Sequence, residues 1–394
     1  MRILFISCES INKQGGTAVR LKEIISIWAK NGHDVLVLAP QYGGHDSLDW
    51  PAAVRLVRFP DRNIFYYLLF ELYSLIFVPL IVVKKKHDVV ISTGGVLSWL
   101  LSKLAGLLNR PYVVELNGIA DIEAARVHSS LIISKLHEWV IRYSGLYKGA
   151  DLFICVARGI RDEIVRRHSS VAEKSVIIGN GIDPSRFFIH DRSECRRILG
   201  IDQSLFIFGF VGLLCPWHGT EDLVTATRIL KARGHGNFET LIVGTGDRYS
   251  ALRSQVIRDR VEHLVHFAGR ITAEMVPIYM GCFDVACQVH NDPVVGRLGD
   301  SMKFWEYLAS GLPVIVSDMS DSSRHVQPGR IGWKYGGGDP FELADRMEYA
   351  MRNPSELSRF KIINRDLAVD GHRWEDIAGG IIAAIERIQE RFKI

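Results

Sequence analysis

Cysteine is scarce in this sequence, and the six cysteines that it contains form no motif. They stand at Cys8, Cys155, Cys195, Cys215, Cys282 and Cys287. None belongs to a C-x-x-C pair, and none has histidines at a metal-binding spacing, so neither a disulfide framework nor a zinc site is indicated. We therefore expect buried thiols in a protein that works in a reducing compartment.

The sequence also has no large excess of charge, and we expect no signal peptide. The formal net charge is +4 over 394 residues, and basic and acidic residues are interspersed except at Lys84–Lys86. This balance gives no support for binding to nucleic acid. At the N-terminus, Met1-Arg2 leads directly into the short run Ile3–Ser7, which is typical of a buried strand. We expect the protein to be cytoplasmic.

The length and composition predict two globular domains. A chain of 394 residues exceeds the size at which one core keeps growing, and 47% hydrophobic with 23% charged residues excludes disorder. Short apolar runs alternate with amphipathic segments of helical length, which predicts the α/β class with parallel sheets. Gly179–Pro184 is dense in turn formers and is the best candidate for a hinge, so we place the domains at 1–182 and 183–373.

The apolar runs give the expected strands. In the first half these are Arg2–Ser7, Asp34–Ala39, Val54–Phe59, Asp88–Ser92, Tyr112–Leu116, Leu152–Val156 and Ser175–Ile178. In the second half they are Phe206–Val211, Thr240–Val243, Leu264–Ala268, Val285–Gln288 and Pro313–Ser317.

One apolar stretch, Ile64–Val83, has the length of a membrane span. It contains Glu71 and Pro79 and is followed by Lys84–Lys86, so three interpretations compete. It is a helix packed in the first domain, an interfacial helix whose lysines meet anionic lipid, or a true span. A span would put the two halves of one parallel sheet on opposite sides of a membrane, which the surrounding strands disfavour.

Glycines after the first predicted strand suggest a phosphate site. Gly15-Gly16-Thr17 opens a predicted helix, where backbone N–H groups and the helix dipole favour an anion. An ordinary tight turn explains the same residues. The chain has no G-x-G-x-x-G and no G-x-x-x-x-G-K-[ST] motif. The sequence therefore gives little support for a dinucleotide-binding protein or a P-loop protein.

The most informative segment is Asp300–Asp318, with the sequence DSMKFWEYLASGLPVIVSD. Lys303 and Glu306 stand three residues apart on a predicted helix, so both side chains leave the same face. A cation suited to phosphates is thereby paired with a carboxylate that can accept two ribose hydroxyls. The alternative is a surface ion pair without function.

This segment resembles the retaining glycosyltransferases of family 4, whose donor site carries a Lys-x-x-Glu-Tyr-x-Ala-x-Gly-x-Pro-Val-Ile string. Four further segments match that family in order: Ile178–Asp183, Phe210–Gly219, Val243–Gly246 and Phe267–Arg270. The resemblance implies the GT-B architecture, with two Rossmann-like domains facing across a cleft. It further implies that the first domain binds the acceptor, that the second binds the nucleotide sugar, and that a C-terminal helix at about 374–394 returns to the first.

The sequence departs from the family pattern at two places. The family often has an Arg and a Lys in its first glycine loop, both reaching the diphosphate, where this chain has Leu213 or Leu214 and His218. We expect His218 to take the lysine's role, although a neutral imidazole gives only one donor. The first member of the family's glutamate pair is replaced by Leu298, so Asp300 or Arg297 is expected to reach the sugar hydroxyls.

In the first domain, Asn117 follows a predicted strand at the edge where ligands of open α/β sheets bind. Relatives often carry a histidine nearby that contacts the transferred sugar, and the Asn117 amide can hydrogen-bond a hydroxyl; a plain turn residue is the alternative. Glu115 is expected to be structural. The expected catalytic residues are Asn117, Lys303 and Glu306, and the expected donor-binding residues are Gly15, Gly16, Gly212, His218, Arg270, Asp300, Lys303 and Glu306.

The resemblance implies transfer from a nucleotide-diphosphate sugar with retention of configuration, the leaving diphosphate taking the acceptor proton. We expect no cofactor and no metal, because the chain lacks a D-x-D triplet. The expected acceptor is a glycan, a glycolipid or a lipid-linked precursor. Ile64 to Lys86 would place the enzyme on the inner face of the plasma membrane. Two alternatives stay open: a sugar-nucleotide epimerase or phosphorylase, and a donor-binding scaffold without activity.

Overall fold

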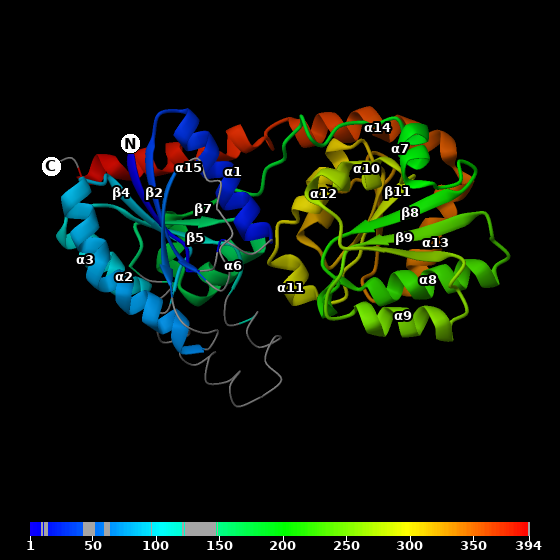
Figure 1. The fold of residues 1–394 in the computed structure, drawn as a ribbon, viewed down its shortest axis with the longest axis horizontal. Helices are drawn as coiled ribbons and strands as arrows, with labels where there is room; N and C mark the ends of the chain where they lie inside the picture. The colour runs from blue at the N-terminus through cyan, green and yellow to red at the C-terminus, as the bar shows by residue number, and fades with distance from the viewer. Residues whose placement is uncertain are drawn as a thin grey trace. The chain divides into compact units, whose positions relative to one another are not determined.

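A computed structural model of the chain describes residues 1–8, 11, 15–41, 52–58, 64–95, 97–119, 122, 147 and 149–392, with only the backbone at 58 and 64–68. The chain forms two compact units. One consists of Met1–Gly181 with Trp374–Ile394, and the other of Ile182–Arg373. The boundary between them falls inside the turn-rich segment Gly179–Pro184. Each unit is built around one parallel sheet, which confirms the α/β class (Figure 1).

The first unit has a seven-stranded sheet in the order β3-β2-β1-β4-β5-β6-β7. The strands are β1 (Arg2–Ile6), β2 (Asp34–Gln41), β3 (Ala53–Arg58), β4 (Val89–Ser92), β5 (Tyr112–Leu116), β6 (Leu152–Cys155) and β7 (Ser175–Ile177). Each overlaps an apolar run that predicted a strand. Phe59, the last residue of one predicted strand, lies outside the described residues.

The second unit has a six-stranded sheet in the order β10-β9-β8-β11-β12-β13. The strands are β8 (Phe206–Val211), β9 (Phe238–Val243), β10 (Val265–Gly269), β11 (Val285–Gln288), β12 (Val314–Ser317) and β13 (Gly332–Tyr335). The sequence missed β13, because its residues GWKY contain a glycine and a lysine and form no apolar run. This edge strand pairs with β12 along its whole length.

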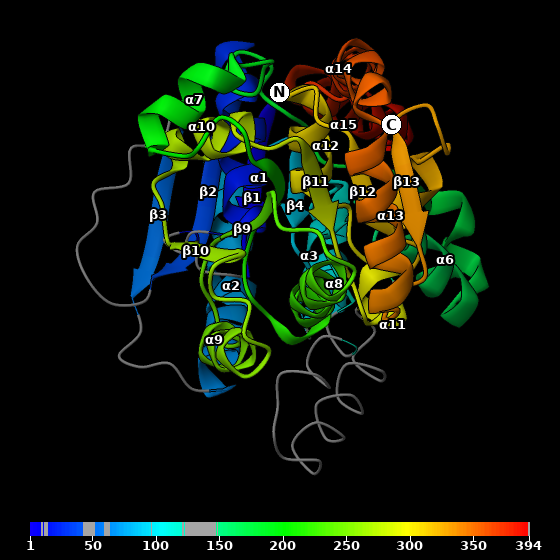
Figure 2. The same cartoon turned by 90° about the vertical axis from the view of Figure 1, so that its right-hand side faces the viewer.

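Helices cover both faces of each sheet (Figures 1 and 2). The first unit has α1 (Gly16–Lys30), α2 (Ile64–Lys85), α3 (Ser98–Leu107), α6 (Arg158–Arg167) and α15 (Trp374–Gln389). The second has α7 (Arg192–Leu199), α8 (Thr220–Ala232), α9 (Tyr249–Arg258), α10 (Val276–Gly281), α11 (Pro293–Arg297), α12 (Met302–Ala309), α13 (Pro340–Arg352) and α14 (Pro354–Val369). There α8, α9 and α13 form one layer, and α7, α10, α12 and α14 form the other (Figure 2).

The end of the chain belongs to the first unit. Helix α15 packs against α1, and Trp28 Nε1 donates a hydrogen bond of 3.0 Å to the Ala378 carbonyl. Trp28 is fully buried, so this bond satisfies an indole N–H that would otherwise be unpaired in the core.

Both sheets share a feature that positions ligands in this class of fold. In each sheet the first strand along the chain lies in the middle, and the next two strands run from it to one edge. The strands that follow run from the middle to the other edge. The order therefore reverses between β1 and β4 in the first sheet and between β8 and β11 in the second. In open α/β sheets, ligands bind at the carboxyl ends of the strands beside this reversal.

The prediction that the cysteines are buried thiols is correct except at Cys8. Five of the six are buried free thiols, but Cys8 is only partly buried because it stands past the end of β1 at the sheet edge. Its backbone N–H donates to Thr93 Oγ1 at 2.9 Å, which joins the ends of β1 and β4.

A buried ion pair holds the first unit together near its last strand. Arg20 on α1 donates through Nε to Glu115 Oε1 on β5 at 2.6 Å, and their side chains are 2% and 4% exposed. The same guanidinium donates to the carbonyls of Ile178 and Gly179 and to Asn180 Oδ1. Glu115 is therefore structural, as the sequence predicts, and Arg20 fastens the segment that leads out of the unit.

We expect Arg20→Met to lower the free energy of unfolding of the first unit by about 3–5 kcal/mol, because the Glu115 carboxylate would stay buried without its partner. Denaturant-dependent hydrogen exchange in β1 to β6 measures this unit separately. The matched control is Arg166→Met, which removes an ion pair to Glu163 whose arginine is 70% exposed. It should cost much less, because water screens an exposed ion pair. Equal losses of unfolding free energy in the two variants would show that the buried ion pair contributes no more to stability than the exposed one.

Candidate functional site

Helix α12 presents Lys303 and Glu306 on one face of the second unit. Most of the other residues of this short helix are apolar and buried: Phe304 and Tyr307 are fully buried and Trp305 is 2% exposed. Lys303 and Glu306 stay partly accessible, one turn apart, as their spacing predicts. The buried face therefore fixes the helix in the core, and the opposite face carries the two charged side chains.

Tyr307 connects α12 to the end of β8. Its hydroxyl accepts a hydrogen bond of 2.8 Å from the backbone N–H of Val211, the last residue of that strand. The sequence analysis did not single out Tyr307, although its place directly after Glu306 in the Lys-x-x-Glu-Tyr string was the available signal. This bond fixes the position of α12 relative to the loop that begins at Gly212.

The Lys303 ammonium lies in a space that Gly212 leaves open. A Cβ atom at Gly212 would stand 3.0 Å from Lys303 Nζ, tighter than most such contacts, so the ammonium would have to shift by a few tenths of an ångström. On another side, Nζ lies 4.7 Å from the centre of the Phe210 ring, a distance at which a cation is attracted to an aromatic face. Glycine at position 212 therefore lets the ammonium keep its present place.

His218 stands on the third side of this ammonium, at the end of the short 3-10 helix Pro216–His218. Its Nε2 is 3.4 Å from Lys303 Nζ, and its Nδ1 is 2.5 Å from the Leu213 carbonyl oxygen. The ring also packs edge-on against His290, with 5.2 Å between the ring centres. His218 follows β8 and His290 follows β11, so the two histidines flank the point where the strand order of the second sheet reverses.

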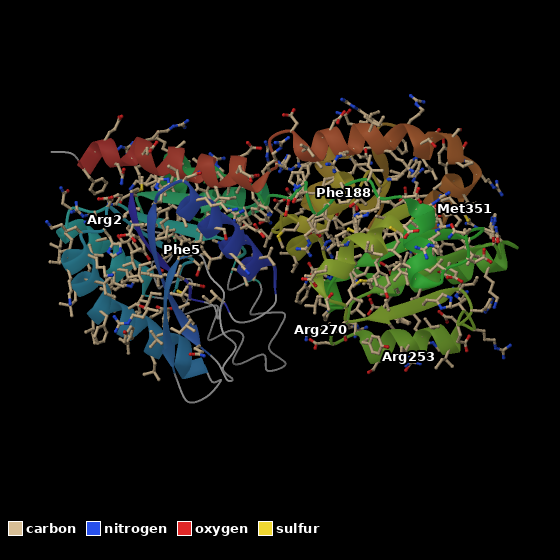
Figure 3. The ribbon with its side chains drawn as sticks, turned by 45° about the horizontal axis from the view of Figure 1, so that its top comes forward. Arg2, Phe5, Phe188, Arg253, Arg270 and Met351 are labelled. Atoms are coloured by element: carbon tan, nitrogen blue, oxygen red, sulfur yellow. The ribbon has the colours of Figure 1, made fainter. Side chains whose placement is uncertain are left out.

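Two glycine turns bring the neighbouring strand ends close to this loop. The Gly244 N–H donates to the Gly269 carbonyl at 2.9 Å, and a Cβ on Gly244 would stand 1.9 Å from the Gly212 carbonyl oxygen. Glycine is therefore required at position 244. Arg270 follows Gly269 at the same sheet edge and is exposed at the surface of the second unit (Figure 3).

Burial shifts both charged side chains of α12 toward their neutral forms. It lowers the pKa of Lys303 to about 8, against the opposing effect of Cys215 and Glu306. It raises the pKa of Glu306 to about 7, opposed first by Arg186 and then by Lys303. No sequence motif pointed to Arg186, which acts on Glu306 from the segment that enters the second unit. Titratable groups shifted toward neutral pH are typical of functional sites.

The two histidines stay neutral. Burial and then the nearby Lys303 charge, with a smaller effect of His290 where that ring is protonated, lower the pKa of His218 to about 2. Burial and Lys303 lower the pKa of His290 to about 3. Lys303 is therefore the cation of this group at neutral pH.

The remaining residues expected at the site are divided between the two units. Asp300 Oδ1 accepts a bond of 3.0 Å from Trp305 Nε1, so one of its oxygens supports α12. Asn117, half-buried after β5, and Gly15 and Gly16, at the start of α1, belong to the first unit. A Cβ on Gly15 would meet no atom within 4 Å, so the described residues give no steric reason for glycine there. Their roles stay predictions.

No metal cluster accompanies these side chains in the described part of the chain. Groups of three or more His, Cys, Asp or Glu side chains placed to hold an ion are absent among the residues that the structure describes.

Comparisons with known proteins point to one class. The family described as Glycosyltransferase Family 4 matches residues 14–186, and that described as Glycosyl transferases group 1 matches residues 206–353. An uncharacterised glycosyltransferase of Methanocaldococcus jannaschii is 22% identical over 77% of each chain. A D-inositol 3-phosphate glycosyltransferase of Actinosynnema mirum is 25% identical over 62% of this chain and 59% of its own length.

The solved structure of HepE from Anabaena, in complex with UDP, has the same fold, with a TM-score of 0.77 at 19% identity. The similarity covers 98% of this chain and 100% of that one. The two Rossmann-like units and these matches define a glycosyltransferase of the GT-B fold. Within that class, the chain belongs to the family 4, or group 1, glycosyltransferases.

The raised pKa of Glu306 predicts a pH-dependent cost in stability. The folded state holds this proton more tightly than the unfolded state, so the stability it adds is lost as pH rises from about 4.5 to about 7. We expect Glu306→Gln to match the native protein near pH 4.5 and to exceed it by about 1–3 kcal/mol at pH 7.5. Thermal unfolding across this range measures the difference.

The control for this prediction is Glu262→Gln, which changes an exposed carboxylate of the same unit. Its difference from the native protein should stay flat over the same pH range. A flat difference for Glu306→Gln would mean that its carboxylate is well solvated and carries no cost.

Proposed function

We propose that this chain transfers a sugar from a nucleotide-diphosphate sugar to a glycan, a glycolipid or a lipid-linked acceptor, with retention at the anomeric carbon and without a metal ion. The observation that carries the proposal is the shared face of α12, where a cation and a carboxylate lie beside the reversal of the second sheet. The complexes of HepE with UDP and with UDP-glucose support a donor of this kind.

Each charged side chain has a task in this reaction. Lys303 meets the diphosphate, whose negative charge grows as the sugar leaves, and Glu306 accepts hydrogen bonds from the ribose hydroxyls. The departing diphosphate oxygen takes the proton of the attacking hydroxyl, so alignment and charge stabilisation replace a protein nucleophile. Asn117 hydrogen-bonds the transferred sugar, Asp300 contacts a sugar hydroxyl, and Arg270 lies near the base.

The proposal that no metal ion is needed depends on which groups of the protein stabilise the negative charge of the diphosphate. The sequence has no D-x-D triplet, the usual means of holding a divalent ion under a diphosphate. Lys303 and the N-terminal end of α12 supply positive charge and N–H donors in its place.

The rival hypothesis is a donor-binding scaffold, and one observation favours it. Leu213, at the place where the family often has an arginine, is exposed at 58%, and Leu214 is fully buried, so neither contributes charge to a phosphate. A sugar-nucleotide epimerase would need added acid and base groups beside Glu306. The scaffold and the epimerase are both outcomes of the first test below.

That test follows sugar release from a panel of nucleotide sugars in the presence of EDTA, since a transferase hydrolyses its donor slowly without an acceptor. We expect the native protein to release sugar from at least one donor and Lys303→Ala to be more than about tenfold slower, because the cation counts most when charge develops on the leaving group. The control is Lys361→Ala, which removes an exposed lysine from α14.

Four results would contradict parts of this proposal. Donor binding without release favours the scaffold, and a changed sugar that stays on the nucleotide favours the epimerase. Activity that disappears in EDTA and returns with manganese contradicts metal independence. Full activity in Lys303→Ala would move the phosphate site away from α12.

Helix α2 supports the part of the proposal that concerns a lipid-linked acceptor. Within the described residues no helix is long and apolar enough to cross a membrane. One side of α2 is core, with Phe70, Val78 and Val82 at most 4% exposed. The opposite side leaves apolar residues exposed at helical spacing, and Lys84–Lys86 follow them: Leu69, Leu72, Ile76, Leu80 and Val83 are 44–63% exposed. We propose that this side rests on an anionic bilayer.

Vesicle sedimentation tests the docking of α2. The protein should bind vesicles that contain anionic lipid at low salt, because three lysines near such a surface add about 3 kcal/mol. Binding should weaken as salt rises and in the Lys84/Lys85/Lys86→Ala variant. Ile76→Ser with Leu80→Ser should weaken it at every salt concentration, since the apolar contribution is not screened. No sedimentation at low salt would leave a soluble acceptor as the better hypothesis.

A further inference from the structure

The tautomer of His218 follows from its neighbours. Nδ1 lies 2.5 Å from the Leu213 carbonyl oxygen, which can only accept, so Nδ1 carries the ring proton. The other near neighbour of Nδ1 is Cys215 Sγ at 3.1 Å, and burial raises the pKa of that thiol to about 11, which keeps it uncharged. A neutral imidazole has one N–H, so Nε2 is left with a lone pair.

That lone pair faces a cation. Nε2 stands 3.4 Å from Lys303 Nζ, and an ammonium group has three N–H donors and no acceptor. Lys303 is therefore the donor and His218 the acceptor. The ring cannot turn away freely, because it packs edge-on against Phe210 and His290 at 6.0 and 5.2 Å between ring centres.

We infer that His218 is a positioning residue for Lys303: its Nε2 accepts one ammonium proton and aims the others at the donor diphosphate. The inference rests on the proposed function, in which Lys303 meets that diphosphate. It replaces the expectation that His218 takes over the role of the family's lysine, since Nε2 has no proton to give to a phosphate oxygen.

The surroundings of Lys303 fit this arrangement. The Phe210 ring attracts the ammonium from one side, Gly212 makes room on a second, and His218 holds one proton on a third. The charged groups that act on His218 are Lys303 and, if it were protonated, His290. A lysine at position 218 would place a second cation beside the first and push Lys303 out of this position.

Three substitutions at one position separate the two roles, with donor hydrolysis as the readout. His218→Ala removes the acceptor and should lower kcat/KM about tenfold, because Lys303 loses its orientation. His218→Gln offers an amide oxygen near the place of Nε2 and should recover most of the loss. His218→Lys, the residue that relatives often have here, should be as impaired as the alanine variant or more. Thermal unfolding checks that each variant is folded.

A double variant tests whether His218 acts through Lys303. In the Lys303→Ala background, His218→Ala should change kcat/KM by less than about twofold, because there is no ammonium left to position. The full tenfold effect in that background, or a His218→Lys variant at least as active as the native protein, would overturn the inference. A native protein that neither binds UDP nor releases sugar from any donor would instead overturn the proposed function and this inference with it.

Discussion

Burial of the apolar side of α12 is the constraint on which the candidate site depends. Trp305 and Tyr307 anchor this helix in the core, through a bond from Trp305 Nε1 to Asp300 and a bond from the Val211 N–H to the Tyr307 hydroxyl. With the helix fixed in this way, Lys303 and Glu306 are held where they are only partly accessible to solvent. The loop after β8 is then shaped around them, with a glycine where the ammonium needs room.

In the protein without a ligand, the charges of Lys303 and Glu306 are poorly stabilised by their surroundings. Desolvation brings the pKa values of Glu306 and Lys303 to about 7 and about 8, which shows that each ion is held in surroundings that favour the neutral form. A diphosphate beside Lys303 and ribose hydroxyls on Glu306 would favour both ions again. Groups that lower the stability of the empty protein and regain it on binding are expected where function, rather than folding, selects the residue.

The sequence predicts those features that depend on local pattern. Apolar runs mark the strands because both faces of a parallel sheet are buried, and β13 escapes because GWKY lacks such a run. The spacing of Lys303 and Glu306 predicts their shared face. Contacts between distant segments leave no local trace: the bond from Arg20 to Glu115, the effect of Arg186 on Glu306, and the direction of the His218 lone pair all need the folded chain.

Binding of the nucleotide diphosphate at α12 is tested most directly by a crystal structure of the protein with UDP. We expect phosphate oxygens within hydrogen-bonding distance of Lys303 Nζ, ribose hydroxyls on the Glu306 carboxylate, and His218 Nε2 still facing Lys303 rather than the phosphate. UDP bound away from α12, or bound there with its phosphates on His218 and apart from Lys303, would contradict it.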